Sequence, residues 1–149
     1  MKIAIASDHG GFELKELIKE YLQKDFKLDV IDFGTNSTEA VDYPDFAFLV
    51  ADAVCTKKAD KGIMIDSIGI ASAMVANKFP GIRAAVCNDL YSANSSKAHN
   101  NANVLTMGAK LIGIGLAKEI VKVWLETEFE VRHQSRIDKI TRIERCFKS

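Results

Sequence analysis

Short apolar segments alternate with amphipathic ones along the whole chain, and this alternation limits the folds that the chain can adopt. Strands are predicted over 3–7, 27–34, 62–66, 82–87 and 103–108, because each segment is apolar at its centre. Strands that are apolar on both faces and separated by helices form a parallel sheet covered on both sides. The expected fold class is therefore α/β: a Rossmann-like three-layer sandwich with a five-stranded parallel sheet and helices on both faces.

Helices are predicted between these strands from apolar residues that recur at spacings of three and four. They are expected around 14–22, 46–54, 69–78, 89–99 and 117–124, with a last, C-terminal helix around 137–147. Tyr43-Pro44-Asp45 marks the start of the second helix, with proline in its first turn. No repeat, low-complexity segment or linker interrupts the pattern, so residues 1–149 are expected to form a single domain.

The charge balance and the cysteines restrict the class of function. The chain has 20 Lys and Arg against 20 Asp and Glu, which argues against non-specific nucleic-acid binding and against a basic membrane-binding surface. No apolar run approaches the length of a membrane span, and the N-terminal residues are predicted to be a strand rather than a signal peptide. Cys55, Cys87 and Cys146 are too widely spaced for a disulfide framework or a metal site, so a reducing, cytoplasmic location is expected.

The segment GIMIDSIGIAS, residues 62–72, places Asp66 at the carboxyl end of a predicted strand. Sheets of this kind bind ligands outside the carboxyl ends of their strands. The segment matches neither a Walker loop nor a G-x-G-x-x-G turn. Asp66 could cap the helix that follows, or it could lie beside backbone amides that face an anion. The spacing alone leaves both interpretations open.

The histidines and one pair of arginines are further candidates for a site. All three histidines lie in polar clusters near predicted element ends: Asp8-His9, His99-Asn100 and Arg132-His133. A single histidine is more often a surface or capping residue, but imidazole also transfers protons near neutral pH. Arg132 and Arg136 are four residues apart, so in a helix they would share one face near its start. Such a pair suits a phosphate, although a solvated basic face is the alternative.

Seven stretches carry a resemblance to a known family along almost the whole chain. They are SDHGGFELK (7–15), DFGT (32–35), VDYPDFA (41–47), ANKFPGIRAA (76–85), CNDLYSA (87–93), HNNANVL (99–105) and RHQSRIDKI (132–140). By these stretches the chain resembles the ribose-5-phosphate isomerase type B family, which also holds the galactose-6-phosphate isomerase subunits. The resemblance implies the same fold, and an aldose–ketose interconversion of sugar phosphates through a cis-enediolate, without a metal or another cofactor. It also implies a homodimer or homotetramer with active sites shared between subunits, and a C-terminal helix that reaches the partner subunit.

The resemblance assigns expected roles residue by residue. His99 would open the sugar ring, with Asn100 beside it. Asp8 and Tyr43 would line the sugar site, and the amide of Gly69 would hold the enediolate oxygen. The expected phosphate ligands are His9, Arg132 and Arg136.

The chain departs from the family pattern Cys-Gly-Thr-Gly-x-Gly, where it has Asp66-Ser67-Ile68-Gly69-Ile70-Ala71. The cysteine that removes the C2 proton falls on Asp66, and the threonine that assists falls on Ile68. Ser67 could replace the lost hydroxyl if it points into the site. Some members use a glutamate as base where this chain has Ser72, so that substitute is missing as well.

Three hypotheses follow from these departures. The first is a homomeric isomerase with Asp66 as the base, since a carboxylate can perform this proton transfer; ribose 5-phosphate is then the expected substrate. The second is a subunit like the A subunit of galactose-6-phosphate isomerase, which needs a cysteine-bearing partner. The third is a non-catalytic protein that binds sugar phosphates.

Overall fold

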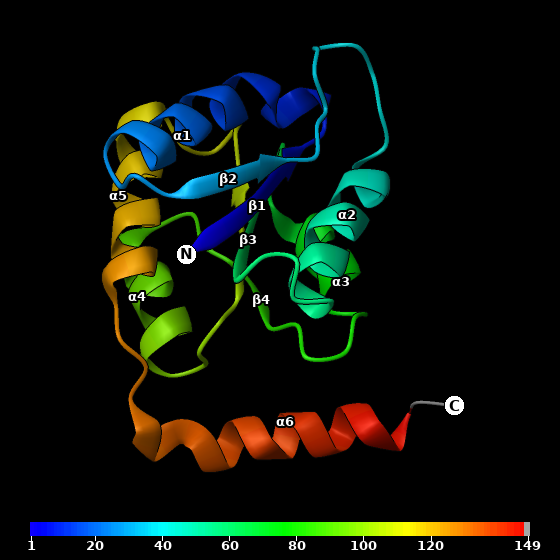
Figure 1. Cartoon of the computed structure of the whole chain (residues 1–149), viewed down its shortest axis with the longest axis vertical. Coiled ribbons are helices and arrows are strands. Elements are labelled where there is room, and N and C mark those ends of the chain that lie inside the picture. Colours follow the sequence, from blue (N-terminus) through cyan, green and yellow to red (C-terminus); the bar gives the residue numbers. More distant parts are fainter. Residues whose placement is uncertain (148–149) are drawn as a thin grey trace.

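One five-stranded parallel sheet organises the chain in the computed structural model, which describes residues 1–147 (Figure 1). The strands are β1 (Lys2–Ser7), β2 (Asp29–Asp32), β3 (Lys61–Asp66), β4 (Ala84–Val86) and β5 (Val104–Gly108), in the order β2-β1-β3-β5-β4. All neighbouring strands run parallel, which confirms the predicted fold class. β2 and β4 are shorter than predicted, because Lys27 and Ile82 belong to turns that precede them: Lys27 has a positive φ of 54°, and the Ile82 amide bonds to Phe79.

Helices cover both faces of this sheet. They are α1 (Phe12–Lys24), α2 (Tyr43–Cys55), α3 (Ile70–Ala76), α4 (Leu90–Ala98), α5 (Ile114–Glu126) and α6 (Gln134–Cys146), with short 3-10 turns η1 (His9–Gly11) and η2 (Val131–His133). Figure 1 shows α2 and α3 on one side of the sheet and α1, α4 and α5 on the other. No helix within residues 1–147 is both long and apolar enough to cross a membrane. Cys55, Cys87 and Cys146 are free within the described residues.

Two apolar cores flank the sheet, because successive side chains of a strand point to opposite faces. Ile3 and Ile5 of β1 pack towards α1 and α5, whereas Ala4 and Ala6 pack towards α2. Trp124 of α5 is fully buried in the first core. The central strands therefore have no polar face, which is why their sequences are continuously apolar.

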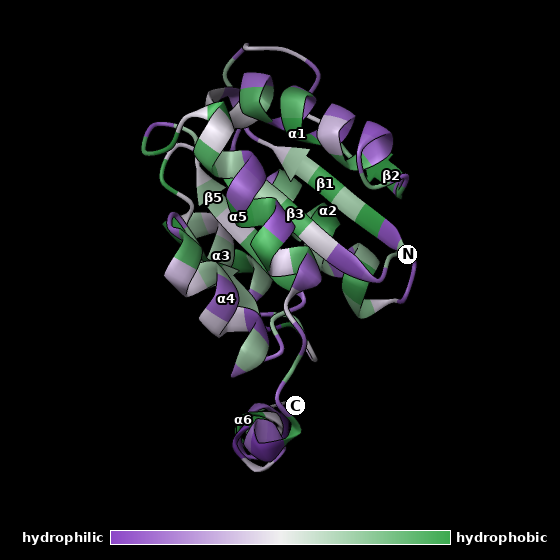
Figure 2. Ribbon diagram, turned by 90° about the vertical axis from the view of Figure 1, so that its left-hand side faces the viewer, coloured by the Kyte–Doolittle hydropathy of each residue, from purple (hydrophilic) through white to green (hydrophobic). Residues whose placement is uncertain are grey.

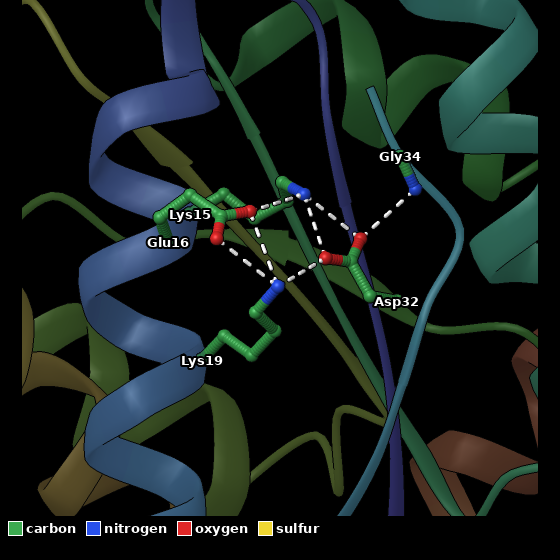
Figure 3. Close-up of polar contacts among 5 residues, drawn as sticks. All are labelled: Lys15, Glu16, Lys19, Asp32 and Gly34. Carbon is green, nitrogen blue, oxygen red and sulfur yellow. Dashed lines mark hydrogen bonds and ion pairs between the residues drawn. The ribbon is translucent and has the colours of Figure 1, made fainter. Parts of the chain in front are cut away.

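A cluster of ion pairs fixes α1 to the end of β2 (Figure 3). The side chain of Lys15 is wholly buried, and its Nζ lies 2.8 Å from both carboxylate oxygens of Asp32. Lys19 donates to the same carboxylate over 2.7 Å, and Asp32 Oδ1 accepts from the Gly34 amide over 2.9 Å. Burial would raise the pKa of Asp32, but the two lysines outweigh it and hold that pKa below its ordinary value. The cluster thus positions the chain after β2, where the Thr35 amide bonds to Ser7 at the end of β1.

Helix α6 lies apart from the three layers, as Figures 1 and 2 both show. Its side chain Ile137 is buried, but Ile140 and Ile143 are 47% and 62% exposed. The Gly81 amide donates to Glu144 over 2.8 Å and ties the far end of the helix to the turn before β4. An apolar stripe on α6 is therefore open at the surface of the chain.

Candidate active site

The carboxyl ends of β1 and β3 form one group of predicted site residues. The strand order places these two strands side by side, and the chain continues from β1 to one side and from β3 to the other. Ligands bind at such switch points in open parallel sheets. A cavity of about 390 Å³ lies there and is lined by Asp8, Tyr43, Asp66, Ser67, Ile68, Ile70, Ala71 and Met74. We call this cavity and its lining the carboxyl-edge half-site.

Asp66 uses its carboxylate to hold the turn that follows β3. One oxygen, Oδ1, accepts from the amides of Ile68 and Gly69, the first over 2.9 Å. The other, Oδ2, accepts from the amide of Ser72 over 3.2 Å and from the Ser72 hydroxyl. A carboxylate has about four acceptor positions, so all of them are in use. In this arrangement Asp66 caps the start of α3, and the cap accounts for why it is only 5% exposed.

Gly69 and Asn88 fix the shape of the same turn. Gly69 has a φ of +91°, and a Cβ there would lie 2.9 Å from the carbonyl carbon of Met107, so glycine is needed on both grounds. The Asn88 side chain donates to the Ile68 carbonyl over 3.2 Å and accepts from the Gly108 amide over 2.8 Å. Thr106 donates to the Gly69 carbonyl over 2.7 Å. The turn is therefore bonded to β5 and to the segment after β4.

Asp8 lies in the same half-site with most of its acceptor capacity free. It is 7% exposed, and the side-chain hydrogen bond that it accepts comes from the Gly11 amide over 3.1 Å. Burial, and to a smaller degree the charge of Asp66, raises the pKa of Asp8 above its ordinary value. Nδ1 of its neighbour His9 lies 3.1 Å from both the amide nitrogen and the carbonyl oxygen of Val41, and His9 is exposed. Asp8 is therefore the carboxylate of the cavity that has room to bind a ligand hydroxyl.

Ser67 also reaches this half-site. A Cβ on Gly10 would lie 2.6 Å from the Ser67 hydroxyl, so glycine at position 10 makes room for that hydroxyl beside Asp8. Ile68, by contrast, brings an apolar side chain that is 39% exposed to the cavity rim. The hydroxyl group that position 68 lacks is thus present one residue earlier in the chain.

The other predicted residues gather at the opposite edge of the sheet. Helix α4 begins after the carboxyl end of β4 and runs back, so His99, at its C-terminal end, lies near the amino ends of the strands. There the Arg83 side chain donates to the Asn100 carbonyl over 3.0 Å, and the Glu130 amide bonds to Ala98. The His99 and His133 rings lie 4.6 Å apart between centroids. We call His99, Asn100, Glu130, Arg132, His133 and Arg136 the amino-edge half-site.

The two arginines do not share one helix face as their spacing predicted. Arg132 belongs to the 3-10 turn η2 and pairs with Glu130, with Nε at 2.8 Å and Nη2 at 2.6 Å from Oε2. Arg136 belongs to α6 and donates through Nη1 to Nδ1 of His133 over 2.8 Å. The cause is that the α-helix begins only at Gln134, after a turn of different pitch. Both guanidinium groups still belong to one cluster, through His133 and Glu130.

Within one chain the two half-sites cannot meet, because they lie at opposite ends of the parallel strands. Asp8, His9, Tyr43, Asp66, Ser67 and Gly69 belong to the carboxyl edge, and His99, Asn100, Arg132 and Arg136 belong to the amino edge. Their charges are also opposite: two carboxylates line the first, and two guanidinium groups dominate the second.

Sequence reasoning missed three residues of these half-sites. From the sequence, Ser72 marked only the absence of a glutamate base. Its bonds to Asp66 could not be predicted, because a separation of six residues follows no known hydrogen-bonding pattern. Asn88 stood in a matched stretch without a role, although an asparagine just after a predicted strand is a usable signal. Glu130 was not predicted, although a carboxylate two residues before Arg132 is a usable signal for an ion pair.

Comparisons with known proteins identify the family of this chain. The model of the ribose/galactose isomerase family matches residues 3–140. The chain is 46% identical over 145 residues to ribose-5-phosphate isomerase B of Escherichia coli, with 96% of each chain covered. It is 44% identical over 131 residues to D-erythrulose-4-phosphate isomerase of Pectobacterium atrosepticum, with 87% of this chain and 86% of the relative covered.

A solved structure is similar over the full length. Ribose-5-phosphate isomerase B of Clostridium thermocellum has a TM-score of 0.96 and 48% sequence identity, with 99% of this chain and 100% of the other covered. The family model covers far more than half of the chain, and the identities lie well above those at which only the fold is shared. The chain therefore belongs to the ribose/galactose isomerase family, a family of sugar-phosphate isomerases.

Proposed function

We propose that this chain interconverts an aldose phosphate and its ketose through a cis-enediolate, with ribose 5-phosphate and ribulose 5-phosphate as the substrate pair. The proposal rests on family membership and on the two half-sites, which separate the tasks that such a reaction needs. The cationic amino edge suits a phosphate, and the carboxylates at the other edge suit proton transfer between carbons. The similarity to ribose-5-phosphate isomerase B supports the pentose, while the relative that isomerises D-erythrulose 4-phosphate makes a tetrose phosphate the alternative.

The observation that carries the proposal is the separation of Asp66 from His99. Both are expected to act on one sugar, yet in one chain they lie at opposite edges of the sheet. We propose a homodimer in which the carboxyl edge of one copy faces the amino edge of the other. Opposite charges favour this pairing, and exposed apolar side chains beside the cavity and on α6 would be covered by it: Ile70 and Met74 on one edge, and Ile140 and Ile143 on the other.

In this account Asp66 removes the C2 proton, and Asp8 and Tyr43 bind sugar hydroxyls. Because the four acceptor positions of Asp66 are in use, the turn 67–72 must release at least one of them before a proton can be accepted. The hydrogen bond from the Ser72 amide, at 3.2 Å, is longer than the one from the Ile68 amide, and the Ser72 hydroxyl can rotate away. Oδ2 is therefore the oxygen that we propose as the proton acceptor. His99 and the arginines would come from the other subunit.

Mixed dimers test the shared site. Asp66→Asn and His99→Asn chains are co-expressed with different tags, and the heterodimer is purified through both tags. One of its two sites then has both substitutions and the other has neither, so about half of the parent activity should return although each homomer is impaired. Two impaired homomers that give an equally impaired heterodimer would show that each site draws on one chain.

The saturated carboxylate of Asp66 favours a second candidate function. If the turn never opens, this chain binds sugar phosphates without turnover, or acts only with a partner subunit that supplies a cysteine. A screen of the purified protein with pentose, hexose and tetrose phosphates separates these cases. Turnover by the homomer supports the first proposal, whereas binding without proton exchange at C2 supports the second.

A further inference from the structure

The amino-edge half-site already contains a carboxylate at its centre. Glu130 Oε2 accepts a hydrogen bond from Nε of Arg132 over 2.8 Å, forms an ion pair with Nη2 of Arg132 at 2.6 Å, and lies 3.6 Å from Nε2 of His133. Ligand atoms of His99, Glu130 and His133 all lie within 4.8 Å of one another. The hydrogen bond and the positive charge of Arg132 hold the pKa of Glu130 below its ordinary value. Glu130 is therefore an anion held by Arg132, one of the groups expected to hold a phosphate.

The hydrogen bonds of His133 show which of its ring nitrogens has the proton. Arg136 can only donate, so Nδ1 of His133 must accept its hydrogen bond. Because Nδ1 accepts, the ring is neutral and its one proton is on Nε2. Burial, and then the charges of Arg132, His99 and Arg136, lowers the pKa of His133, which favours this neutral form. That Nε2 is buried and has no hydrogen-bond partner among residues 1–147, and at 3.6 Å Glu130 is too distant to be one. A buried donor thus points towards Glu130 without being satisfied by it.

A metal ion fits this cluster poorly. Two histidines and a glutamate are a common donor set for zinc. Here, however, Arg136 fills the lone pair of Nδ1 of His133, and the proton that remains covers Nε2. Arg132 occupies Oε2 of Glu130, and the guanidinium groups of Arg132 and Arg136 would repel a cation. The cluster therefore has free donors and positive charge, which recognise an anion.

We infer that Glu130 competes with the phosphate group of the substrate for Arg132 and His133, and so sets the affinity of this site for sugar phosphates. The inference rests on the proposed function in taking the amino edge as the phosphate site. A phosphate has three strong acceptor oxygens and can satisfy Arg132 and the orphan Nε2 of His133 together, which the glutamate does not. Binding then requires Glu130 to swing out towards solvent, where its side chain is already 44% exposed.

The substitution Glu130→Gln tests this competition, because it removes the negative charge and keeps the shape. We expect inorganic phosphate and ribose 5-phosphate to bind about two- to fivefold more tightly, the range expected for an exposed ion pair. Ribose, which has no phosphate, should show no change. Glu128→Gln, an exposed glutamate two residues earlier, is the matched control and should leave phosphate affinity unchanged. Titration calorimetry measures all of these affinities without requiring turnover.

A double-mutant cycle then shows whether the effect passes through Arg132. In an Arg132→Ala background, Glu130→Gln should have little further effect on phosphate affinity. Equal or weaker phosphate binding by Glu130→Gln, or no binding by either protein, would overturn the inference and show that Glu130 positions Arg132 or only neutralises a surface. A protein that gains phosphate affinity on Glu130→Gln but isomerises no sugar would instead contradict the proposed function alone.

Discussion

Asp66 and Ser72 are joined twice, since Oδ2 of Asp66 accepts from both the backbone amide and the side-chain hydroxyl of Ser72. Ser72 is fully buried, and its two bonds to Asp66 tie the end of β3 to the first turn of α3. Asp66, which stands where the family pattern has a cysteine, therefore also holds the turn that follows it. A role in proton transfer and a role in holding the turn therefore depend on the same two oxygens.

Replacing Ser72 by alanine should lower the free energy of unfolding by about 1.5–3 kcal/mol. A buried carboxylate loses one charge-assisted hydrogen bond and has no solvent to replace it. Urea unfolding measures the change, with the exposed Ser135→Ala as control. A Ser72→Ala protein as stable as the parent would show that the turn does not depend on this bond.

The substitution Lys15→Met should destabilise the protein by about 2–4 kcal/mol. It keeps the shape of the buried side chain but leaves Asp32 with Lys19 as its remaining ion-pair partner, so the cost is somewhat below that of an isolated buried charge. The matched control is Lys24→Met on the same helix, whose pair with Glu20 is exposed and should matter little. Similar losses for both variants would show that the buried cluster contributes nothing specific.

Acid should remove the contribution of Asp32. The folded-state pKa of Asp32 is lowered, so its stabilising effect is fully present above the ordinary aspartate pKa of about 4 and is lost as the pH falls through the lower, folded value. We expect the free energy of unfolding to decline below about pH 4, and to decline less steeply in Lys15→Met. Equal slopes in the two proteins, measured by urea unfolding at several pH values, would contradict this assignment.

Arg136→Ala should weaken sugar-phosphate binding by about 1.5–3 kcal/mol, the usual worth of a charge-assisted hydrogen bond. The substitution also frees Nδ1 of His133, so part of the loss would come from a reoriented ring. Arg142→Ala, an exposed arginine further along α6, is the control and should bind normally. If calorimetry gave the same affinity for Arg136→Ala and the parent, the arginines would form a solvated basic face after all.

Much of the fold could be predicted from the sequence, because the apolar pattern of each segment agrees with its place in the whole fold. The continuously apolar strands predicted a sheet covered on both faces, and the structure confirms five parallel strands with two cores. Strand order could not be predicted, since it depends on how helices pack across the sheet rather than on any one segment. The predicted strands at β2 and β4 were too long, because their apolar centres did not show where the preceding turns, such as the one at Lys27, end.

The sequence indicated candidate residues for the site but not their arrangement. Asp8, Tyr43, Asp66 and Ser67 do line one cavity, as expected from the resemblance. The sequence could not predict the hydrogen bonds between Asp66 and Ser72 or between Glu130 and Arg132. These bonds depend on side-chain conformations, which residue spacing does not determine. Asp66 as a cap and Asp66 as a base were both open from the sequence; the hydrogen bonds show the cap, and the role as base stays a prediction.

The rate of C2 proton exchange in Asp66→Asn is the most direct test of the proposed mechanism. Asparagine keeps the shape and removes the base, so kcat on the best substrate, and deuterium exchange at C2, should fall by about 10²–10⁴-fold. Phosphate affinity and the thermal unfolding temperature, measured on the same sample, control for a damaged turn. If Asp66→Asn exchanges the C2 proton as fast as the parent while both bind phosphate equally, Asp66 is a structural cap and another group is the base.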